Sequence, residues 1–210
     1  GYDTEAQTAG GIGPFSYTII DTTAADPAFS AGLEIKAGYA QARIEPLAGV
    51  SLDAGVRYED ATQQVVPLGL DGLPSGSANA TLLNNDYWLP AATLTWEIAD
   101  SLQARFNASK TIARPQFREL ILQTYYDPES NRQFTGNPGL VDSELTNFEA
   151  RVEYYWGSGS KFSLAGFYKD IENPIEVFSS FNDNTVVSRF AKAPQAELYG
   201  AEVEVQWNKD

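Results

Sequence analysis

Residues 50–59 read VSLDAGVRYE, in which Val50, Leu52, Ala54, Val56 and Tyr58 are apolar and the residues between them are polar or small. A period of two predicts a β-strand with one apolar face, because successive side chains of a strand point to opposite sides. Strands of soluble proteins are mostly about 5–6 residues long, whereas a tilted strand that crosses a bilayer needs about 9–11. The stretch is of the second size, so it predicts a membrane-crossing strand.

The same alternation recurs six more times along the chain. The apolar positions lie at about residues 40–44, 88–98, 102–108, 148–156, 162–168 and 199–207. Three connections are short (45–49, 99–101 and 157–160) and three are long (about 60–86, 111–146 and 171–196). Compact soluble domains rarely contain several structureless loops longer than about 12–15 residues. Short turns at one end and long loops at the other are instead typical of outer-membrane barrels.

The sequence therefore predicts an all-β fold, an antiparallel meander of long tilted strands that forms a segment of a large transmembrane β-barrel. We expect an extracellular loop region over residues 1–32 and about seven transmembrane strands over residues 33–210. Within the last long connection, residues 175–178 and 185–190 flank an Asn-Asp-Asn turn signal. This pattern predicts a hairpin that extends the strands above the membrane.

The composition fits this fold and excludes several classes of protein. The mean hydropathy is −0.29, and no apolar run approaches the ~18 residues of a spanning helix. The net charge of −14 comes without a basic stripe, so we expect no nucleic-acid partner. Many aromatic residues lie near strand ends, where interfacial girdles belong, and we expect Tyr87 and Trp88 in the outer girdle. The sequence has no Met and no signal peptide, so we expect it to be a piece of a longer protein.

Four motifs carry a resemblance to a known family. They are GVRYE at 55–59, SKTIARPQFREL at 109–120, GNPGL at 136–140 followed by NFE at 147–149, and FYKDIENPI at 167–175 with GAE at 200–202. Their order and spacing resemble the barrel of TonB-dependent outer-membrane receptors. One departure is Asp142-Ser143, where many members carry Pro-Glu.

The resemblance implies an energy-coupled importer of a Gram-negative outer membrane. Its members are barrels of about 22 strands closed around an N-terminal plug. Their extracellular loops capture a scarce nutrient, such as an iron chelate, cobalamin or an oligosaccharide, and an inner-membrane complex pulls on a TonB box. This chain would be about a third of such a barrel, without plug, TonB box or closing strand. The implied partners are outer-membrane lipid, the plug domain, TonB and a small-molecule nutrient, with no cofactor and no metal.

Charged residues recur on the polar side of the predicted strands, where a barrel has its lumen. They are Arg57, Glu59, Glu149, Arg151, Glu153, Glu202 and Glu204. Residues two apart on a strand share a face, so these side chains are expected to form a charge ladder between neighbouring strands. The alternative is contact with an inserted plug domain or a passing ligand.

The long connection at 111–146 contains the candidate ligand-binding residues. Flat aromatic faces combined with hydrogen-bonding groups suit a sugar or a chelate. The candidates are Tyr125, Tyr126, Asp127, Arg132 and Phe134. The alternative is a loop that packs its own aromatic side chains.

An enzyme and a soluble module are the two alternative function classes. An enzyme lacks support, because the absence of His and Cys removes a Ser-His-Asp triad and the usual zinc sites. Glu202 and Glu204, about 6–7 Å apart by strand rise, suit a lumen wall better than a glycosidase pair. We therefore predict no catalytic residue.

A soluble β-rich binding or assembly module is the remaining alternative. As a sandwich it would bury one set of alternating side chains between two sheets. The barrel instead predicts a lipid-facing set, namely Leu52, Val56, Leu94, Phe106, Val152, Leu164 and Val203. An isolated barrel piece would also self-associate through its unpaired sheet edges.

Overall fold

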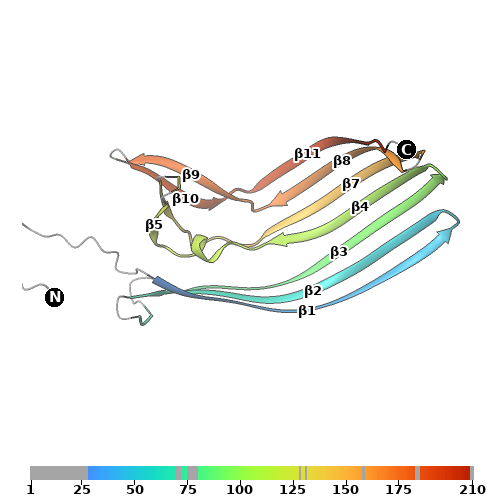
Figure 1. Ribbon diagram of the computed structural model, residues 1–210. Coiled ribbons are helices and arrows are strands. Elements are labelled where there is room, and N and C mark those ends of the chain that lie inside the picture. The colour runs from blue at the N-terminus through green and yellow to red at the C-terminus, as the bar shows by residue number, and fades with distance from the viewer. Residues whose placement is uncertain are drawn as a thin grey trace, which may run out of the picture.

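The main element of the structure is a seven-stranded antiparallel sheet, here called the wall. The computed structural model describes residues 28–69, 72–74, 80–127, 129–130, 132–157, 159–182 and 185–208. The strand order of the wall is β1-β2-β3-β4-β7-β8-β11 (Figure 1). The strands are β1 (Ala28–Leu47), β2 (Val50–Leu68), β3 (Thr81–Ala99), β4 (Leu102–Ala113), β7 (Ser143–Trp156), β8 (Ser160–Glu172) and β11 (Gln195–Gln206). The predicted antiparallel meander is confirmed, and β1 begins ahead of the expected boundary at residue 33.

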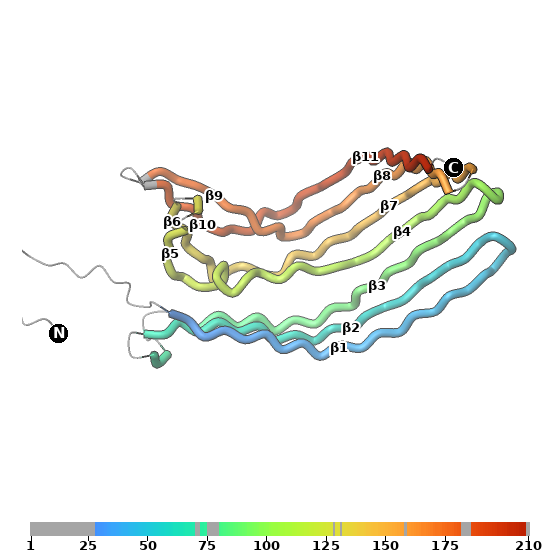
Figure 2. The backbone as a smooth tube through the Cα atoms, viewed as in Figure 1, coloured from blue at the N-terminus to red at the C-terminus, as the bar shows by residue number. Residues whose placement is uncertain are grey.

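The short turns and the long connections lie at opposite ends of the wall. The β1–β2, β3–β4 and β7–β8 turns share the right-hand end in Figure 2, and the longer connections gather at the left. Gly49 in the first turn has a φ of 76°, and Gly157 in the third has a φ of 54°. A residue without a Cβ reaches this left-handed region at no steric cost, so glycine closes both turns. The predicted short turns are confirmed.

A second, four-stranded sheet covers the end where the long connections gather. It consists of β5 (Thr124–Asp127), β6 (Arg132–Thr135), β10 (Thr185–Lys192) and β9 (Ile175–Asn182), in that order. A short 3₁₀ helix, η2 (Phe117–Glu119), precedes β5. β9 and β10 form the hairpin predicted from residues 175–190, and β10 also pairs in parallel with β6.

The hairpin continues the β8–β11 pair through a kink that contains two prolines. The Asn173 N–H donates to the Pro194 carbonyl (3.2 Å), and the Ala193 N–H donates to the Pro174 carbonyl (2.9 Å). Asn173 has a φ of 51°, a left-handed conformation that Asn adopts more readily than most residues. The pairing therefore survives the kink, and the hairpin bends away from the line of β8 and β11 (Figure 1).

Two of the connections expected to be long loops are largely structured. β2 and β3 stay paired as far as Val65 opposite Thr81, so most of residues 60–86 is strand and the expected loop is wrong there. The reason is packing, because Ala61, Gln63 and Val65 are buried beneath residues 114–142. Residues 114–142, here called the mouth segment, contain η2, β5 and β6 and fold back onto the wall.

One face of the wall is apolar across all seven strands. Residues that are directly opposite in neighbouring strands share a face, and one such row is Ile44, Leu52, Leu94, Phe106, Ala150, Gly166 and Ala201. The next row includes Val152, Leu164 and Val203, which are 45%, 48% and 65% exposed. A sandwich would cover these side chains with a second sheet, and the described residues place none there. The sandwich alternative is therefore wrong.

The buried core lies on the opposite face, where the mouth segment meets the wall. Val65 from β2 packs with Leu120, Ile121 and Leu140 from the mouth segment, and each is at most 2% exposed. Phe29, Leu83, Phe117, Ile175 and Phe190 surround this cluster. Among the described residues, no helix is long and apolar enough to cross a membrane.

Candidate functional site

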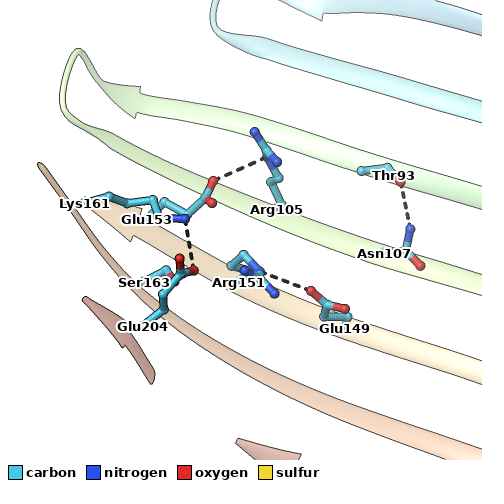
Figure 3. Close-up of polar contacts among 9 residues, drawn as sticks. All are labelled: Thr93, Arg105, Asn107, Glu149, Arg151, Glu153, Lys161, Ser163 and Glu204. Carbon is cyan, nitrogen blue, oxygen red and sulfur yellow. Dashed lines mark hydrogen bonds and ion pairs between the residues drawn. The ribbon is translucent and has the colours of Figure 1, made fainter. Parts of the chain in front are cut away.

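The polar face of the wall carries a ladder of charged side chains (Figure 3). Arg105 on β4 lies directly opposite Arg151 on β7, a pairing of like charges. Each guanidinium instead contacts a carboxylate of β7 that is displaced by two residues along the strand. The distance is 3.5 Å from the Arg105 Nε to the Glu153 carboxylate and 3.3 Å from the Arg151 Nε to the Glu149 carboxylate. One contact is diagonal between β4 and β7 and the other runs along β7, and together they offset the repulsion between the two arginines.

The ladder continues onto β8 and β11. The Lys161 ammonium lies 3.0 Å from Glu204, whose carboxylate also accepts a hydrogen bond from the Ser163 hydroxyl at 3.3 Å (Figure 3). Glu202 shares this face, stands opposite Ala165 and is exposed. Glu204 is thus paired with a cation on the neighbouring strand, as the expected charge ladder requires.

Glu153 is the most enclosed acid of the ladder. Its side chain is only 6% exposed, and its Oε2 makes an ion pair with Arg105 but no hydrogen bond to any described residue. The side chains around it line a hollow of about 290 Å³, together with Thr93, Asn107 and Glu149. A buried oxygen with unused hydrogen-bonding capacity leaves room for one further donor in this hollow.

Glu59 on β2 holds the beginning of the mouth segment. Its two carboxylate oxygens are taken by different cations, Oε1 by Arg57 at 2.7 Å and Oε2 by Arg114 at 2.8 Å. Glu59 is 8% exposed. Arg57 and Glu59 share one face, as expected, but they pair along β2 rather than between neighbouring strands, and Arg114, which the sequence reasoning did not single out, completes the group.

Further hydrogen bonds tie the mouth segment to the polar face of β2 and β3. Gln63 Nε2 donates to the Pro115 carbonyl (2.7 Å), and the Thr81 hydroxyl donates to the Leu120 carbonyl (2.9 Å). At the other end of the segment, the Tyr87 hydroxyl donates to Asp142 (2.9 Å). The segment is therefore anchored at both ends and in the middle.

The placement of Tyr87 corrects one expectation. Tyr87 and Trp88 are consecutive on a strand, so they point to opposite faces. Trp88 lies on the apolar face against Tyr58, with ring centroids 4.9 Å apart, whereas Tyr87 lies on the polar face. Trp88 alone fits the outer girdle.

The GNPGL motif forms the tightest contact of the mouth segment. A Cβ at Gly136 would lie 2.2 Å from the Ile121 carbonyl oxygen and 2.7 Å from that of Arg118, so only glycine fits. The Asn137 side chain accepts from the Gly139 N–H (2.9 Å) and donates to the Phe190 carbonyl (3.1 Å). The motif thus joins η2, at the start of the mouth segment, to β10.

Two of the five ligand candidates pack against other aromatic side chains. Tyr125 stacks on Phe134 with ring centroids 5.7 Å apart, and Phe134 stacks on Phe190 at 5.8 Å. The Arg118 guanidinium covers the free face of Tyr125, 4.8 Å from the ring centroid. Partial burial raises the pKa of the Tyr125 hydroxyl. Packing of the loop's own aromatics accounts for Tyr125 and Phe134.

The other three candidates lie nearer to solvent. Tyr126 points to the other side of β5 and is 58% exposed, and Arg132 is exposed at the start of β6. Asp127 accepts a 2.6 Å hydrogen bond from the Ser130 hydroxyl, which lowers the pKa of the carboxyl group. The structure therefore does not bring all five into one cluster. In the described part of the chain, no group of three or more acidic residues is arranged to hold a metal ion.

Sequence reasoning missed Arg114, Arg118, Gln63 and Asp142. Arg114 and Arg118 stand in the motif at 109–120, and a cation beside a predicted strand end was the available signal. Gln63 and Asp142 gave no local signal, because their partners are 52 and 55 residues away in the chain.

The comparisons with known proteins agree with this architecture. The β-barrel model of TonB dependent receptor-like proteins matches residues 1–209. The structure is similar to the hemophore receptor HasR of Serratia marcescens, with a TM-score of 0.61 and 14% identity over 84% of this chain and 32% of HasR. A comparison with curated proteins finds no match.

Two further receptors show the same fold. The ferric-catecholate import receptor Fiu of E. coli K12 has a TM-score of 0.58 and 16% identity over 84% of this chain and 26% of Fiu. The alcaligin receptor FauA of Bordetella pertussis has a TM-score of 0.55 and 19% identity over 86% of this chain and 28% of FauA. The chain thus spans about a third or less of these receptors. On the match of the family model, this chain belongs to the TonB-dependent receptors and forms part of their β-barrel.

Proposed function

We propose that this chain is part of the wall of an outer-membrane receptor that binds a scarce nutrient and imports it with energy delivered through TonB. The nutrient would be an iron chelate, cobalamin or an oligosaccharide. HasR, Fiu and FauA are receptors for a hemophore, ferric catecholates and alcaligin, respectively, which supports an importer. Binding and passage need no catalytic residue.

The observation that carries the proposal is the uncovered apolar face of the wall. Phe106, Val152, Leu164 and Val203 are between 45% and 65% exposed on one continuous surface. Soluble proteins rarely expose an apolar surface that spans a whole sheet. In a barrel this surface is the lipid-facing band, and the aromatic pair of Tyr58 and Trp88 marks its border with the headgroups.

The polar face would line the lumen and meet the plug domain of the complete receptor. Arg57, Glu149, Arg151, Glu153, Glu202 and Glu204 all lie on this face. Glu202 is exposed, and Glu153 keeps an unused acceptor, so these two are the best placed to receive donors from a plug. Glu59 has both oxygens occupied, and its proposed role is to hold the mouth segment.

The end with the long connections would face the cell exterior. This orientation places residues 1–32 in an extracellular loop region and the strands of residues 33–210 in the membrane, with extracellular extensions. Residues 1–27 of that loop region lie outside the described residues. The mouth segment, with Tyr126, Asp127 and Arg132 near solvent, would meet an arriving nutrient.

Fractionation of the native source tests the proposal. An antibody to this segment should detect, in the outer-membrane fraction, a band several times larger than 22.9 kDa. The band should migrate differently with and without boiling, because folded barrels resist detergent. A soluble band near 22.9 kDa that is indifferent to heating would overturn the proposal and favour a soluble β-rich module.

A further inference from the structure

A pocket of about 570 Å³ lies at the mouth, between the start of β1 and the chain that runs from η2 into β5. Its lining includes Phe29, Arg118, Ile121, Gln123, Thr124 and Tyr125. Phe29 stands opposite Pro67 in β2, on the same face as Val65, so the pocket opens on the polar side of the wall. A ligand in the pocket would therefore lie at the entrance to the lumen.

Arg118 supplies the only charge among the described residues that line the pocket. Two acids on the same segment, Glu119 and Asp127, each accept a hydrogen bond from another group. Glu119 accepts from the Gln116 N–H at 2.9 Å, and Asp127 accepts from the Ser130 hydroxyl at 2.6 Å. No described carboxylate lies within 4.0 Å of the Arg118 guanidinium. In a chain with a net charge of −14, the lining of this pocket carries one positive charge and no negative one.

The cation is held in place before any ligand arrives. The Arg118 guanidinium lies 4.8 Å from the centroid of the Tyr125 ring, which itself stacks on Phe134 and, through it, on Phe190. The backbone on both sides of Arg118 is fixed by the buried Leu120 and by the close approach of Gly136. Holding a donor in its binding geometry lowers the entropic cost of binding.

From these features we infer that the pocket binds an anionic group carried on a flat ring. The guanidinium fork donates two parallel hydrogen bonds to a carboxylate or a similar anion. The attached ring packs on Phe29 and Tyr126, while Thr124 and Gln123 offer hydrogen bonds at the rim. This inference rests on the proposed receptor function and selects among its substrates, because a neutral oligosaccharide gains nothing from the lone cation.

The test compares a charged and an uncharged probe on the purified full-length receptor. The probes are 2-naphthoate and 2-naphthalenemethanol, which share a ring system and differ in charge, with maltotriose as a neutral sugar. Equilibrium dialysis should show that 2-naphthoate binds at least about tenfold more tightly than 2-naphthalenemethanol, as expected for a charge-assisted pair. Equal binding of the two naphthalene probes, or tighter binding of maltotriose, would overturn the inference.

Arg118→Gln should reduce 2-naphthoate binding at least about tenfold and leave 2-naphthalenemethanol unchanged. The matched control is Arg189→Gln, which removes an exposed cation of β10 that does not line the pocket. Arg118→Lys keeps the charge but loses the planar fork, so it should fall between the wild type and Arg118→Gln. Equal effects of Arg118→Gln and Arg189→Gln would contradict a pocket-specific site.

The inference and the proposed function fail in different ways. One set of results would overturn the inference alone. In it, the receptor fractionates with the outer membrane and supports TonB-dependent uptake of a neutral sugar, and the Arg118→Gln variant takes up that sugar normally. Absence of the protein from the outer membrane would overturn the proposed function. The shift in migration on boiling checks that each variant is folded, and a misfolded Arg118→Gln is replaced by Arg118→Lys.

Discussion

In the wall, Phe106 and Leu164 are about half exposed, at 47% and 48%, whereas in the mouth segment Leu120 and Leu140 are 0% and 1% exposed. The wall is held by backbone pairing between long strands and by ion pairs on its polar face, without a core of its own. The mouth segment instead buries its apolar side chains against β2 and β3, as a small globular domain does. The wall therefore depends on its surroundings for stability, while the mouth segment depends on a buried core that it forms with β2.

The largest local effect is expected from Leu120→Ala. Removing a fully buried leucine side chain typically costs about 2–5 kcal/mol, and here the loss falls on the mouth segment. Hydrogen exchange of the full-length receptor should show faster exchange across residues 114–142 and at the ends of β2 and β3 that this segment covers, with β7, β8 and β11 unchanged. Leu122→Ala is the matched control, because Leu122 is 62% exposed. Equal exchange in the two variants would mean that the mouth has no independent core.

Val152→Arg should destabilise the wall rather than the mouth. An arginine at a lipid-facing site near the membrane midplane costs about 2–4 kcal/mol. Urea unfolding of the receptor in lipid vesicles should report this loss. The control is Gln103→Arg, on the polar face opposite Glu97 and Glu153, where a cation meets two acids. If Val152→Arg were no more destabilising than Gln103→Arg, the apolar face would not be in contact with lipid.

Glu59→Gln tests the link between the two regions. The change removes the negative charge that Arg57 and Arg114 share, and losing charged hydrogen bonds at this buried position should cost about 1–3 kcal/mol. Exchange should rise first at residues 114–122. Glu149→Gln is the comparison variant, because it removes a single 3.3 Å contact, with Arg151, from a more exposed acid of the ladder. Similar exchange in both variants would show that Glu59 does not anchor the mouth segment.

Lys161→Gln should have the smallest effect. The ion pair with Glu204 is largely open to solvent on the Glu204 side, whose side chain is 52% exposed, so it should contribute about 0–1 kcal/mol. Unfolding midpoints of wild type and variant should converge further as the salt concentration rises. A large loss that salt does not reduce would mean that the ladder contributes more to the wall than exposed ion pairs do.

The difference between wall and mouth also decides how much the sequence could predict. Strands such as residues 50–59 can be recognised in the sequence by a period of two, because successive side chains face opposite sides of the wall. The shared face of Arg57 with Glu59 and of Arg151 with Glu149 followed from the same period, whereas their pairing along one strand did not.

The mouth could not be predicted in this way. Its contacts join residues far apart in the chain, such as Gln63 with Pro115 and Thr81 with Leu120. Tyr125 and Phe134 looked like ligand residues because flat aromatic side chains suit both binding and packing, and only the register of β5 and β6 shows that they stack. The end of the predicted strand near Asp60 was wrong for the same reason, because docking of the mouth segment keeps β2 and β3 paired as far as Val65.

Site-directed spin labelling along β8 tests the central claim most directly. These 210 residues contain no cysteine, so a single cysteine introduced at any of residues 161–165 is the one labelling site in this part of the full-length receptor, which is studied in lipid vesicles with any other cysteines replaced. The account predicts that labels at Phe162 and Leu164 collide with lipid-soluble oxygen, while labels at Lys161, Ser163 and Ala165 meet a water-soluble paramagnetic reagent or are shielded from both. Equal access of the water-soluble reagent to all five positions would contradict a wall with one face in lipid.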